Sequence, residues 1–428
     1  MSGSLLLILL LTLFLLNVPI AIAIGLASVS VMLIGSDFSL MVVIQRMFSG
    51  ADSFHLMAVP LFMYAGLLME KGGISERLIN LANALVGWLP GGLAAVTIVS
   101  AMFFAGISGS AAADTAAVGG LLIPAMRRSG YRADFAAAVQ AAGGSIGVII
   151  PPSIPMIIFG FLTGASIGKL FAAGILPGIL IGLTLIATAT FISVKHGYRA
   201  ENVFSWRAVL TALRQALLAL GAPVIVLGGI LGGIFTATES AAVAVVYAFV
   251  VGMFIYKKIM LRDLSAVFIE GSIIAAVVMF IISTASVFSW IAAIEDLPAR
   301  LAETLFSVSD NPVVLLLLIN LLLLVAGTFV ETTAALILLV PMIVTMVPVL
   351  GIDLVHLGVI VVTNLAIGML TPPMGICLIV SGAISGEHIG AISRRIIPFL
   401  LILIVDLLII SFYPPLSMWL AGYIGMPG

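Results

Sequence analysis

The fold is decided by the stretch Phe103-Phe104-Ala105-Gly106-Ile107-Ser108-Gly109-Ser110-Ala111-Ala112-Ala113-Asp114-Thr115. Asp114 is the only charged residue between Gly91 and Met126, and the polar tripeptide 108–110 divides this apolar run near its middle. Each half is too short to cross a bilayer, because a helical span needs about 20 apolar residues. We therefore predict a re-entrant hairpin with its turn at Ser108–Ser110. Irregular backbone at membrane depth is tolerated only where protein or water satisfies it, so this tip marks a site.

A second copy of the pattern lies in the other half of the chain. Gly327-Thr328-Phe329-Val330-Glu331-Thr332-Thr333 interrupts an apolar run, 311–352, whose only charge is Glu331. Aligning Asp114 with Glu331 gives an offset of 217 residues, which also aligns Pro124 with Pro341. Further matches keep the same order: Gly147, Pro151, Pro152 and Pro177 with Gly368, Pro372, Pro373 and Pro398, and Arg77-Leu78 with Arg300-Leu301. An ordered series of this length indicates an internal duplication.

Composition places the chain among polytopic membrane proteins. Of its 428 residues 63% are hydrophobic and 8% charged, and the mean hydropathy is +1.35. The net charge of −1 argues against a nucleic-acid partner. The single Cys377 excludes an internal disulfide and a cysteine cluster, and four scattered histidines argue against structural zinc. No Lys or Arg precedes Arg46, so the N-terminal run is expected to be a retained helix rather than a signal peptide.

The apolar runs predict an all-α chain in two halves of similar plan. In the first half we expect spans at 5–16, 18–34 and 41–69 (long enough to tilt or to kink at Pro60), an amphipathic interfacial helix at 74–85, a hairpin at 92–127, a broken helix at 133–161, and a span at 171–194. After a polar connection at 195–214 we expect spans at 215–234, 241–256 and 266–294, an interfacial helix from 296, a hairpin at 312–350, a broken helix at 355–387, and a span at 396–421.

Each half then contains five spans and one re-entrant hairpin, so the odd number of crossings would insert the two repeats with inverted topology. The positive-inside rule supports this arrangement, since 14 of the 17 Lys and Arg residues fall on the side from which the first hairpin enters. Both termini are then expected outside. Inverted repeats with paired broken helices are typical of alternating-access carriers. The expected division is a scaffold of 1–90 and 195–310, each part with an arm helix, and transport-domain halves at 91–194 and 311–428.

The tips and helix breaks could form two sites for a small hard cation. Proline removes helical hydrogen bonds and frees carbonyl oxygens, so oxygens would converge from each tip and the break opposite it. The first copy offers oxygens of Ser108, Gly109 and Ser110 with the break at Gly147 and Pro151-Pro152, and the second copy offers backbone oxygens of Gly327, Thr328 and Phe329 with those of Gly368, Thr371 and Met374. The alternative is that these glycines only permit close helix packing. Two mirrored pairs favour sodium sites, and no organic cofactor is expected.

Polar side chains beside the tips are candidates for substrate contact. Asp114 and Glu331 could cap the returning helices, or they could couple ions or protons. Substrate-binding candidates are Ser108, Asp114, Thr115, Thr332 and Thr333, and for the threonines the alternative is a hydroxyl satisfied within its own helix. An anionic substrate would find no Arg or Lys at the midplane. Helix N-termini and bound cations could supply the positive potential instead.

Two other functions deserve comparison with a carrier. Gly106-Ile107-Ser108-Gly109 is similar to the Gly-x-Ser-Gly of rhomboid intramembrane serine proteases. That chemistry needs a histidine beside the serine, whereas all four histidines fall near expected span ends. A protease also gives no reason for the second tip. A metabolite channel is a further alternative, but duplicated hairpins beside broken helices suit occlusion better than an open pore. The chain is therefore not expected to be an enzyme.

The chain resembles the large membrane subunit of tripartite ATP-independent periplasmic (TRAP) transporters. The resemblance extends through nearly the whole chain in the motifs Ala58-Val59-Pro60-Leu61-Phe62, Ser108-Gly109-Ser110 with Ala113-Asp114-Thr115-Ala116-Ala117, Ile150-Pro151-Pro152-Ser153, Gly233-Ile234-Phe235-Thr236 with Thr238-Glu239, Gly327-Thr328-Phe329 and Thr371-Pro372-Pro373. It implies a sodium-driven elevator of the ion-transporter superfamily in the bacterial inner membrane. The implied partners are membrane lipid, a small four-helix membrane subunit, and a periplasmic binding protein that delivers an organic acid. The resemblance implies sodium ligands at Ser108, Ser110, Gly147 and Ile150 in the first copy, and at Gly327, Phe329, Gly368, Thr371 and Met374 in the second.

The substrate is indicated only as a class. The first tip, with Ala113-Asp114-Thr115, is similar to members that handle sugar acids such as sialate or diketogulonate, and the second tip to members that handle four-carbon dicarboxylates. The related divalent-anion symporters, which work without partners, carry Ser-Asn-Thr at their tips, and this chain does not. A self-sufficient sodium/anion symporter is therefore the alternative to the tripartite carrier.

Overall fold

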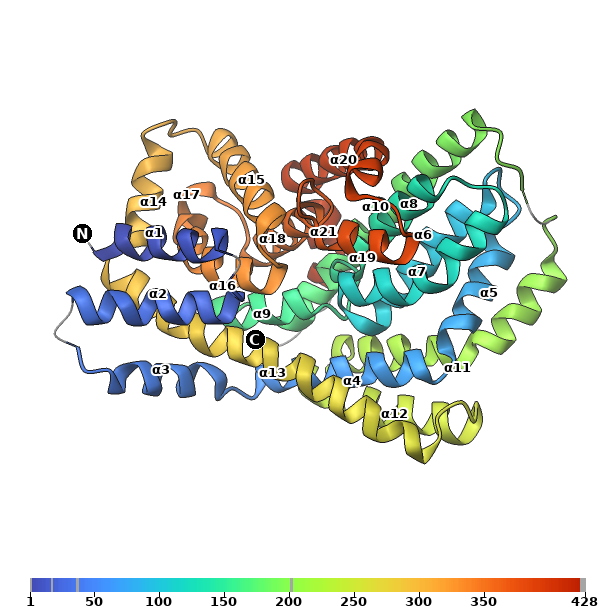
Figure 1. The fold of residues 1–428 in the computed structure, drawn as a ribbon, viewed down its shortest axis with the longest axis horizontal. Coiled ribbons are helices and arrows are strands. Elements are labelled where there is room, and N and C mark those ends of the chain that lie inside the picture. Colours follow the sequence, from blue (N-terminus) through green and yellow to red (C-terminus); the bar gives the residue numbers. More distant parts are fainter. Residues whose placement is uncertain (1, 17, 36–37, 201–202, 424–428) are drawn as a thin grey trace.

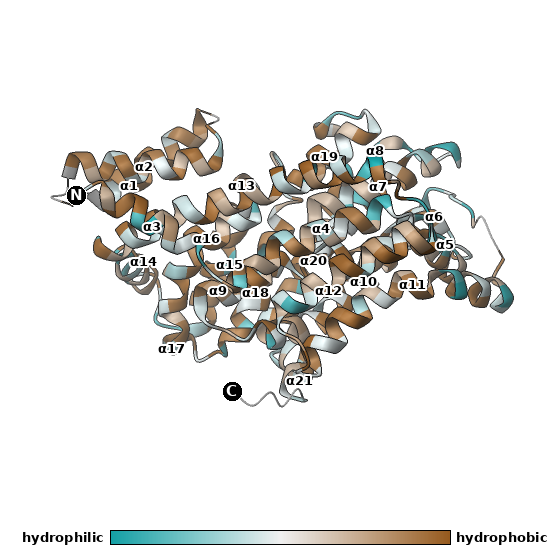
Figure 2. Ribbon diagram, turned by 90° about the horizontal axis from the view of Figure 1, so that it is seen from below, coloured by the Kyte–Doolittle hydropathy of each residue, from teal (hydrophilic) through white to brown (hydrophobic). Residues whose placement is uncertain are grey.

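The structure, a computed structural model, describes residues 2–16, 18–35, 38–200 and 203–423. Within these ranges the chain is entirely helical and contains no strand, as predicted. Seven helices are long and apolar enough to cross a membrane, or eight if the bent pair formed by α3 and α4 counts as one span. Figure 2 shows hydrophobic residues along most helices, whereas hydrophilic residues gather mainly in connections and at the molecule's ends. The fold is therefore a multi-helix membrane fold.

One set of helices, here the flanking group, comes from residues 2–86 and 206–306. Its members are α1 (Ser2–Leu15), α2 (Ile20–Gly35), α3 (Met41–Ala51), α4 (Ala58–Lys71), α5 (Ile74–Val86), α11 (Trp206–Leu231), α12 (Ala237–Val250), α13 (Leu261–Ile294) and α14 (Leu297–Phe306). The 34-residue α13 packs against α2, α3 and α4, and α12 packs against α4 and α11. In Figure 1 this group follows the left and lower edges and extends to the right-hand end.

The segment 41–69 bends, but not at Pro60, and α3 with α4 counts either as one broken span or as two separate helices. The chain leaves the helix at Asp52, and α3 is bent by 65° relative to the 3-10 turn His55–Met57 and α4 that follow. Pro60 lies in the first turn of α4, where a missing N–H has little helical bonding to disturb. The polar pair Asp52-Ser53, not the proline, therefore marks the break.

Both expected amphipathic arm helices are present as α5 and α14. Ile74, Leu78, Leu81 and Ala82 form the buried face of α5 at helical spacing. Pro298 stands in the first turn of α14, where its fixed φ suits a helix start. Arm helices of this kind connect each flanking segment to a hairpin.

The remaining helices form the hairpin group. Its first half contains α6 (Gly92–Ser108), α7 (Ala111–Arg128), α8 (Ala133–Ser145), the 3-10 turn Ile146–Val148, α9 (Ile154–Thr163) and α10 (Ile167–Lys195). Its second half contains α15 (Pro312–Phe329), α16 (Thr332–Ile343), the 3-10 turn Val344–Met346, α17 (Val347–Leu350), α18 (Leu354–Gly368), α19 (Ile376–Ser385), α20 (Ile389–Phe412) and α21 (Pro415–Tyr423). Helix pairs α6–α7 and α15–α16 stand at the two predicted hairpins, and α8–α9 and α18–α19 at the two predicted broken helices. In the second pair both arms, 312–329 and 332–350, are long and apolar enough to count as candidate spans, unlike the short arms that a re-entrant hairpin was expected to have.

Several boundaries in the second half differ from expectation. Helix α11 begins at Trp206, inside the expected polar connection 195–214 and before the expected span at 215–234. The predicted span at 396–421 is two helices, because α20 ends at Phe412 and α21 begins at Pro415. Tyr413 precedes Pro414 and has left the helical region, as residues before proline tend to do. The second tip is also narrower than predicted, since α15 continues through Phe329 and only Val330 and Glu331 lie between the helices.

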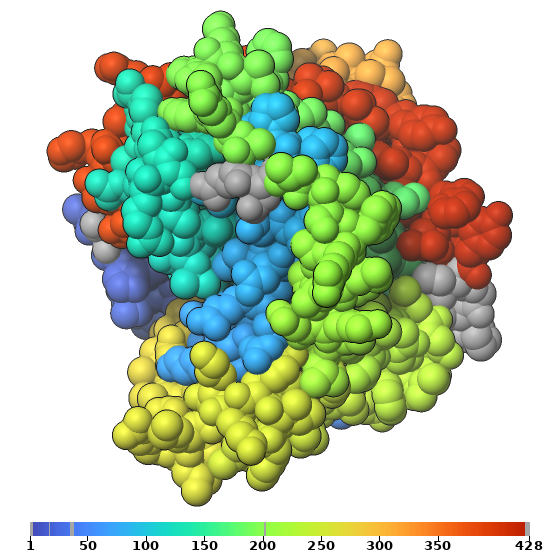
Figure 3. Space-filling model, turned by 90° about the vertical axis from the view of Figure 1, so that its right-hand side faces the viewer, coloured from blue at the N-terminus to red at the C-terminus, as the bar shows by residue number. Residues whose placement is uncertain are grey.

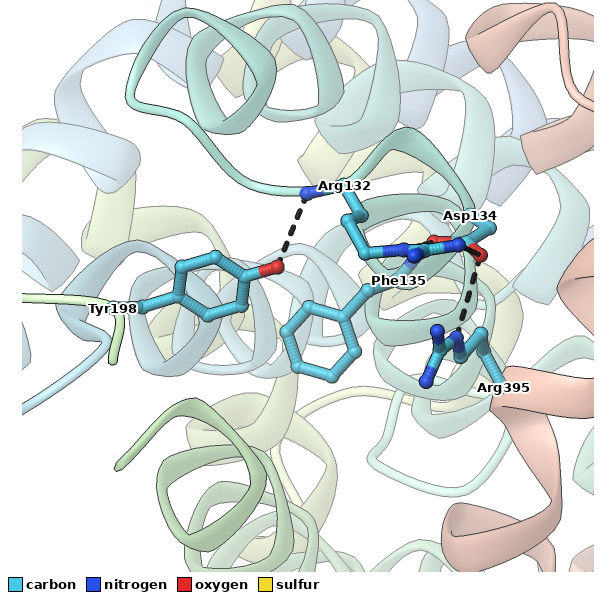
Figure 4. A network of polar contacts seen from close by, with 5 residues as sticks. All are labelled: Arg132, Asp134, Phe135, Tyr198 and Arg395. Atoms are coloured by element: carbon cyan, nitrogen blue, oxygen red, sulfur yellow. Dashed lines mark hydrogen bonds and ion pairs between the residues drawn. The ribbon is translucent and has the colours of Figure 1, made fainter. Parts of the chain in front are cut away.

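The two halves of the hairpin group interlock rather than lying apart. Helix α19 of the second half packs against α7 and α8 of the first, and α9 packs against α16. At one end of α8, Asp134 accepts hydrogen bonds from Arg132 of its own segment (2.8 Å to Oδ2) and from Arg395 of α20 (3.3 Å), as Figure 4 shows. Phe135 and Tyr198 stack beside this network, with ring centroids 5.8 Å apart. The halves therefore meet through both apolar and ionic contacts.

Candidate functional site

The first tip is a tight turn between two helix ends. Gly109 closes α6 with a left-handed backbone (φ +63°), which a residue with a side chain would adopt only with strain. Ser110 then begins α7 as its N-cap, and its hydroxyl accepts a hydrogen bond from the N–H of Ala113 at 3.5 Å. The N–H of Ser110 donates to the hydroxyl of Ser108 at 3.1 Å. The predicted polar turn therefore lies where the sequence placed it.

Asp114 holds its carboxylate against the opposing helix break. The side chain is fully buried and accepts a hydrogen bond from the Ser108 hydroxyl through Oδ1. Among the described residues Oδ2 has no hydrogen-bond partner. A Cβ added to Gly147 would lie 2.3 Å from this Oδ2 and 3.2 Å from the carbonyl oxygen of Ser110. Oδ2 of Asp114 and the carbonyl oxygen of Ser110 thus face the helix break at position 147, where only glycine leaves room for them.

The same tip is docked onto the second half of the broken helix. The N–H of Ile154, at the start of α9, donates to the carbonyl of Gly109 at 3.3 Å. A Cβ added to Gly109 would lie 2.7 Å from the carbonyl oxygen of Pro152. Ser153 caps α9 by accepting from the N–H of Met156 at 3.3 Å. Oxygens of the tip and of the proline break are therefore neighbours, as the cation hypothesis requires. Ile150, a predicted ligand, directly precedes this break and packs against Gly178.

The second tip is built differently, around a glycine pair. Gly327 of α15 and Gly368 of α18 meet backbone to backbone: a Cβ on Gly368 would lie 2.6 Å from Cα and 3.0 Å from the carbonyl oxygen of Gly327. Glu331 is the N-cap of α16, accepting from the N–H groups of Thr333 (2.9 Å) and Ala334 (3.4 Å). Glu331 therefore caps its helix, whereas in the first tip Ser110 has that task and Asp114 lies four residues further on.

The other predicted ligands of the second copy surround the glycine pair. The carbonyl of Gly368 accepts from the N–H of Thr371 at 2.9 Å, and the Thr371 hydroxyl donates back to the carbonyl of Ile367 at 3.0 Å. Phe329 and Met374 have exposed side chains, so any contribution from them to a cation site would come from backbone oxygens. The structure brings Gly327 and Gly368 into contact.

A cavity of about 610 Å³ joins the two tips. On one side it is lined by Gly109, Ser110 and Val148 of the first half and by Glu331, Thr333 and Met369 of the second. On the other side it is closed by flanking helices α2 and α13, mainly through apolar residues such as Ile22, Ile274 and Phe280. The cavity therefore lies between the hairpin group and the flanking group and is in contact with both tips.

Four helices begin at this cavity. The lining includes Ala111 at the start of α7, Ile154 at the start of α9, Thr333 at the start of α16 and Ile376 at the start of α19. Each helix N-terminus carries a partial positive charge and unsatisfied N–H groups, so convergent N-termini favour an anion. Among the described residues the cavity lining contains no Arg or Lys, and its one charged side chain, Glu331, caps α16.

Only one of the predicted substrate-binding side chains lines this cavity. Thr333 does so, although its hydroxyl also donates to Glu331 at 3.1 Å. Asp114, Thr115 and Thr332 are buried behind the tips. Thr115 donates to the carbonyl of Ala111 at 2.7 Å, and Thr332 donates to the sulfur of Met369 at 2.9 Å. Ser108 is half-buried and directed toward Asp114 rather than into the cavity.

Gln140, Met369 and Asp406 were not anticipated from the sequence, and the first two contact the residues of these sites. Gln140 donates to the carbonyls of Asp114 and Thr115, at 3.3 Å each, and so holds α7 against α8. Met369 both lines the cavity and accepts the Thr332 hydroxyl. Asp406, fully buried, accepts from the Thr184 hydroxyl at 2.6 Å. Asp406 could have been singled out from the sequence, because it is the only charged residue in 396–423.

The protease alternative finds no support at Ser108. The hydroxyl of Ser108 pairs with Asp114 and with backbone groups of Ser110, and no histidine is among these partners. His356, which is buried, is engaged elsewhere with the Ser417 hydroxyl at 2.6 Å. The serine therefore lacks the neighbouring histidine that this protease chemistry requires.

Comparison with protein families gives a match over most of the chain. Residues 7–416 match the family described as "Tripartite ATP-independent periplasmic transporter, DctM component". The sialic acid TRAP transporter large permease of Vibrio cholerae is 41% identical over 92% of this chain and 92% of its own length. The C4-dicarboxylate large permease of Pseudomonas aeruginosa is 39% identical, covering 93% of both chains.

Two further comparisons concern domain content and fold. The isethionate TRAP transporter permease of Oleidesulfovibrio alaskensis is 42% identical over 92% of this chain, but the matched part is 62% of that longer protein. Among solved structures, the YdaH transporter of Alcanivorax borkumensis aligns over 90% of this chain and 88% of its own with a TM-score of 0.52. Sequence identity there is 16%, so this likeness concerns the fold alone.

Proposed function

Because the chain belongs to the family of large membrane permeases of TRAP transporters, we propose that it imports a small organic acid by sodium-coupled, binding-protein-dependent transport. The observation that carries the proposal is the cavity at which four helix N-termini from both hairpins and both broken helices converge. An anion bound there would be stabilised without a buried Arg or Lys. The names of the relatives, which cite sialic acid, C4-dicarboxylates and isethionate, agree with an organic acid.

Sodium would bind at the two tips and supply further positive charge. In the first site the donors are Asp114, the tip oxygens of Ser108 and Ser110, and the break at Gly147 and Ile150. In the second site they are backbone oxygens of Gly327 and Phe329 facing Gly368, Thr371 and Met374. Support comes from the unpartnered buried Oδ2 of Asp114 and from the close backbone contact between Gly327 and Gly368. Hard oxygen donors of this type suit an alkali cation.

Transport would follow an elevator mechanism between inverted repeats. The hairpin group, corresponding to 91–194 and 311–428, would move as one body against a scaffold built from 1–90 and 195–310. The interlocking of α19 with α7 and α8, and of α9 with α16, supports a single moving body. The chain would lie in the bacterial inner membrane with both termini in the periplasm, because Lys and Arg residues concentrate on one side of the expected topology.

Reconstitution in liposomes distinguishes a tripartite carrier from a self-sufficient sodium/anion symporter. Uptake of sialate, a C4-dicarboxylate and isethionate is measured in liposomes under an inward sodium gradient, with the small membrane subunit and the binding protein each added or omitted. We expect that one of these acids is taken up, and that its uptake requires sodium, the small membrane subunit and the binding protein together. Full-rate uptake by this chain alone would establish a self-sufficient symporter. Uptake with both partners that ignores sodium would contradict the proposed coupling.

A further inference from the structure

A polar groove lies far from the tips, between arm helix α5 and the start of α11. Asn80 and Asn83 from α5 and Arg207, Thr211 and Gln215 from α11 line a volume of about 590 Å³. Residues three or four apart share one helix face, so each helix directs a polar stripe toward the other. Figure 3 shows α5 (blue, centre) and α11 (green) side by side on this surface of the molecule.

The floor of the groove is apolar. Leu81 of α5 packs with Ala212 and Ala216 of α11 in a small buried cluster. Past the groove, α11 continues with exposed apolar residues, among them Leu217 and Val224. The site therefore has a polar mouth followed by an apolar surface along the same helix, which matches the division of a lipid into headgroup and acyl chains.

Aromatic residues at the mouth place it at the membrane–water interface. Trp88 and Phe204 meet edge to face with ring centroids 5.8 Å apart, and Phe204 meets Trp206 in the same way at 5.2 Å. All three rings are exposed in part. Tryptophan concentrates at the level of lipid headgroups, where its apolar ring and polar N–H are both accommodated. Trp88 also donates its N–H to the carbonyl of Leu85 at 2.8 Å, which fixes the ring.

The charge of the groove favours an anion. Arg207 is the charged residue among those that line it, and the connection 195–214 carries four Lys or Arg and one acidic residue. A guanidinium binds phosphate through two parallel N–H groups, and amide side chains can donate to the remaining phosphate oxygens. The required ligand chemistry is therefore a phosphate ester that presents a negative charge at the interface.

We propose that this groove binds the phosphate of an anionic glycerophospholipid, with Arg207, Asn80 and Gln215 around the headgroup and the acyl chains along α11. The bound lipid would fasten arm helix α5 to α11 at the membrane surface. The proposal rests on the groove and its aromatic border and is independent of substrate, sodium and the moving body.

Native mass spectrometry tests the proposal on the purified full-length chain. The chain is titrated with phosphatidylglycerol or phosphatidylcholine that carry identical acyl chains. Because one basic residue near a membrane surface contributes about 1 kcal/mol, we expect about a fivefold preference for phosphatidylglycerol. Arg207→Gln should remove the preference and Arg207→Lys should retain it. Arg214→Gln is the matched control, since it removes an equal charge from the same helix outside the groove lining.

Three outcomes would overturn the proposal. The first is equal retention of both lipids by the wild-type chain, and the second is an equal loss of preference in Arg207→Gln and Arg214→Gln, which would indicate diffuse surface charge. The third is displacement of the lipid by micromolar inorganic phosphate or sn-glycerol 3-phosphate, which would assign the groove to a soluble phosphate ester. Circular dichroism of each variant checks that the fold is retained. If Arg207→Gln does not fold, the preference of the wild-type chain and its response to soluble phosphate still decide between the outcomes.

Discussion

Two carboxylates that look equivalent in the sequence differ in what they do. Glu331 is the N-cap of α16, whereas Asp114 follows the N-cap Ser110 by four residues and caps nothing. The caps Ser110 and Glu331 are 221 residues apart, the same spacing that relates Gly147 to Gly368, so the structure pairs these caps. The alignment of Asp114 with Glu331 was therefore shifted by four residues, about one helical turn.

This difference predicts that neutralising Asp114 mainly weakens sodium dependence, whereas neutralising Glu331 mainly lowers stability. Asp114→Asn removes the charge on the unpartnered Oδ2 beside Gly147, so the sodium concentration for half-maximal uptake should rise at least about tenfold, equivalent to ~1.4 kcal/mol. Glu331→Gln weakens a helix cap and should cost about 1 kcal/mol of stability with a smaller change in sodium dependence. Sodium titration of uptake and thermal unfolding in detergent measure the two effects. The reverse pattern would assign sodium coupling to Glu331 instead.

Glycine at the break is expected to be as important as the carboxylate it faces. Gly147→Ala would place a methyl group 2.3 Å from Oδ2 of Asp114, so the tip and the break must separate. Overpacking of this kind costs about 1–3 kcal/mol, and sodium-dependent uptake should fall with it. Gly120→Ala is the control, because a Cβ there meets nothing within 4 Å. If both variants transport equally well, the break does not contribute to the proposed sodium site.

At the scale of elements, the sequence predicted the order of the helices better than their caps and bends. The proline of α14 agrees with its preference for a first helical turn, whereas α7 and α9 are capped by Ser110 and Ser153 and the cap considered at Asp114 is absent. The bend before α4 was misplaced at Pro60, because proline is tolerated in a first turn and Asp52-Ser53 was not recognised as a helix end. The break at Tyr413-Pro414 followed the rule for residues before proline, and the prediction did not apply it.

The ion pair between α8 and α20 gives a prediction about how the two halves are joined. Arg395→Gln removes the contact with the largely buried Asp134, and we expect a loss of about 1 kcal/mol in unfolding free energy, since part of the pair is exposed. Arg394→Gln is the matched control, because Arg394 is exposed and adjacent. A double-mutant cycle with Asp134→Asn isolates the pairwise energy. A coupling energy near zero would mean that apolar packing alone joins the halves.

At the scale of the whole molecule, the sequence predicted the order of elements and not their interlocking. Offsets near 221 residues identified corresponding hairpins and breaks, because glycine and proline are required wherever a helix must stop. Nothing in one sequence indicates that α19 packs on α7 and α8 or that α9 packs on α16. These contacts join residues more than a hundred positions apart through ordinary apolar surfaces, and helical periodicity specifies only that such surfaces are buried.

The central claim is that the hairpin group moves against the flanking group during transport, and a reversible cross-link tests it most directly. A Cβ on Gly106 of α6 would lie 3.3 Å from Cβ of Pro223 in α11, close to the ~3.5–4.5 Å found in disulfides. In a Cys377→Ala background, Gly106→Cys with Pro223→Cys joins the two groups. Gly25→Cys with Thr284→Cys, where the corresponding distance is 3.8 Å, joins α2 to α13 within the flanking group. We predict that oxidation abolishes uptake by the first pair, that reduction restores it, and that the second pair transports in both states. Undiminished uptake by the fully cross-linked first pair would contradict the account.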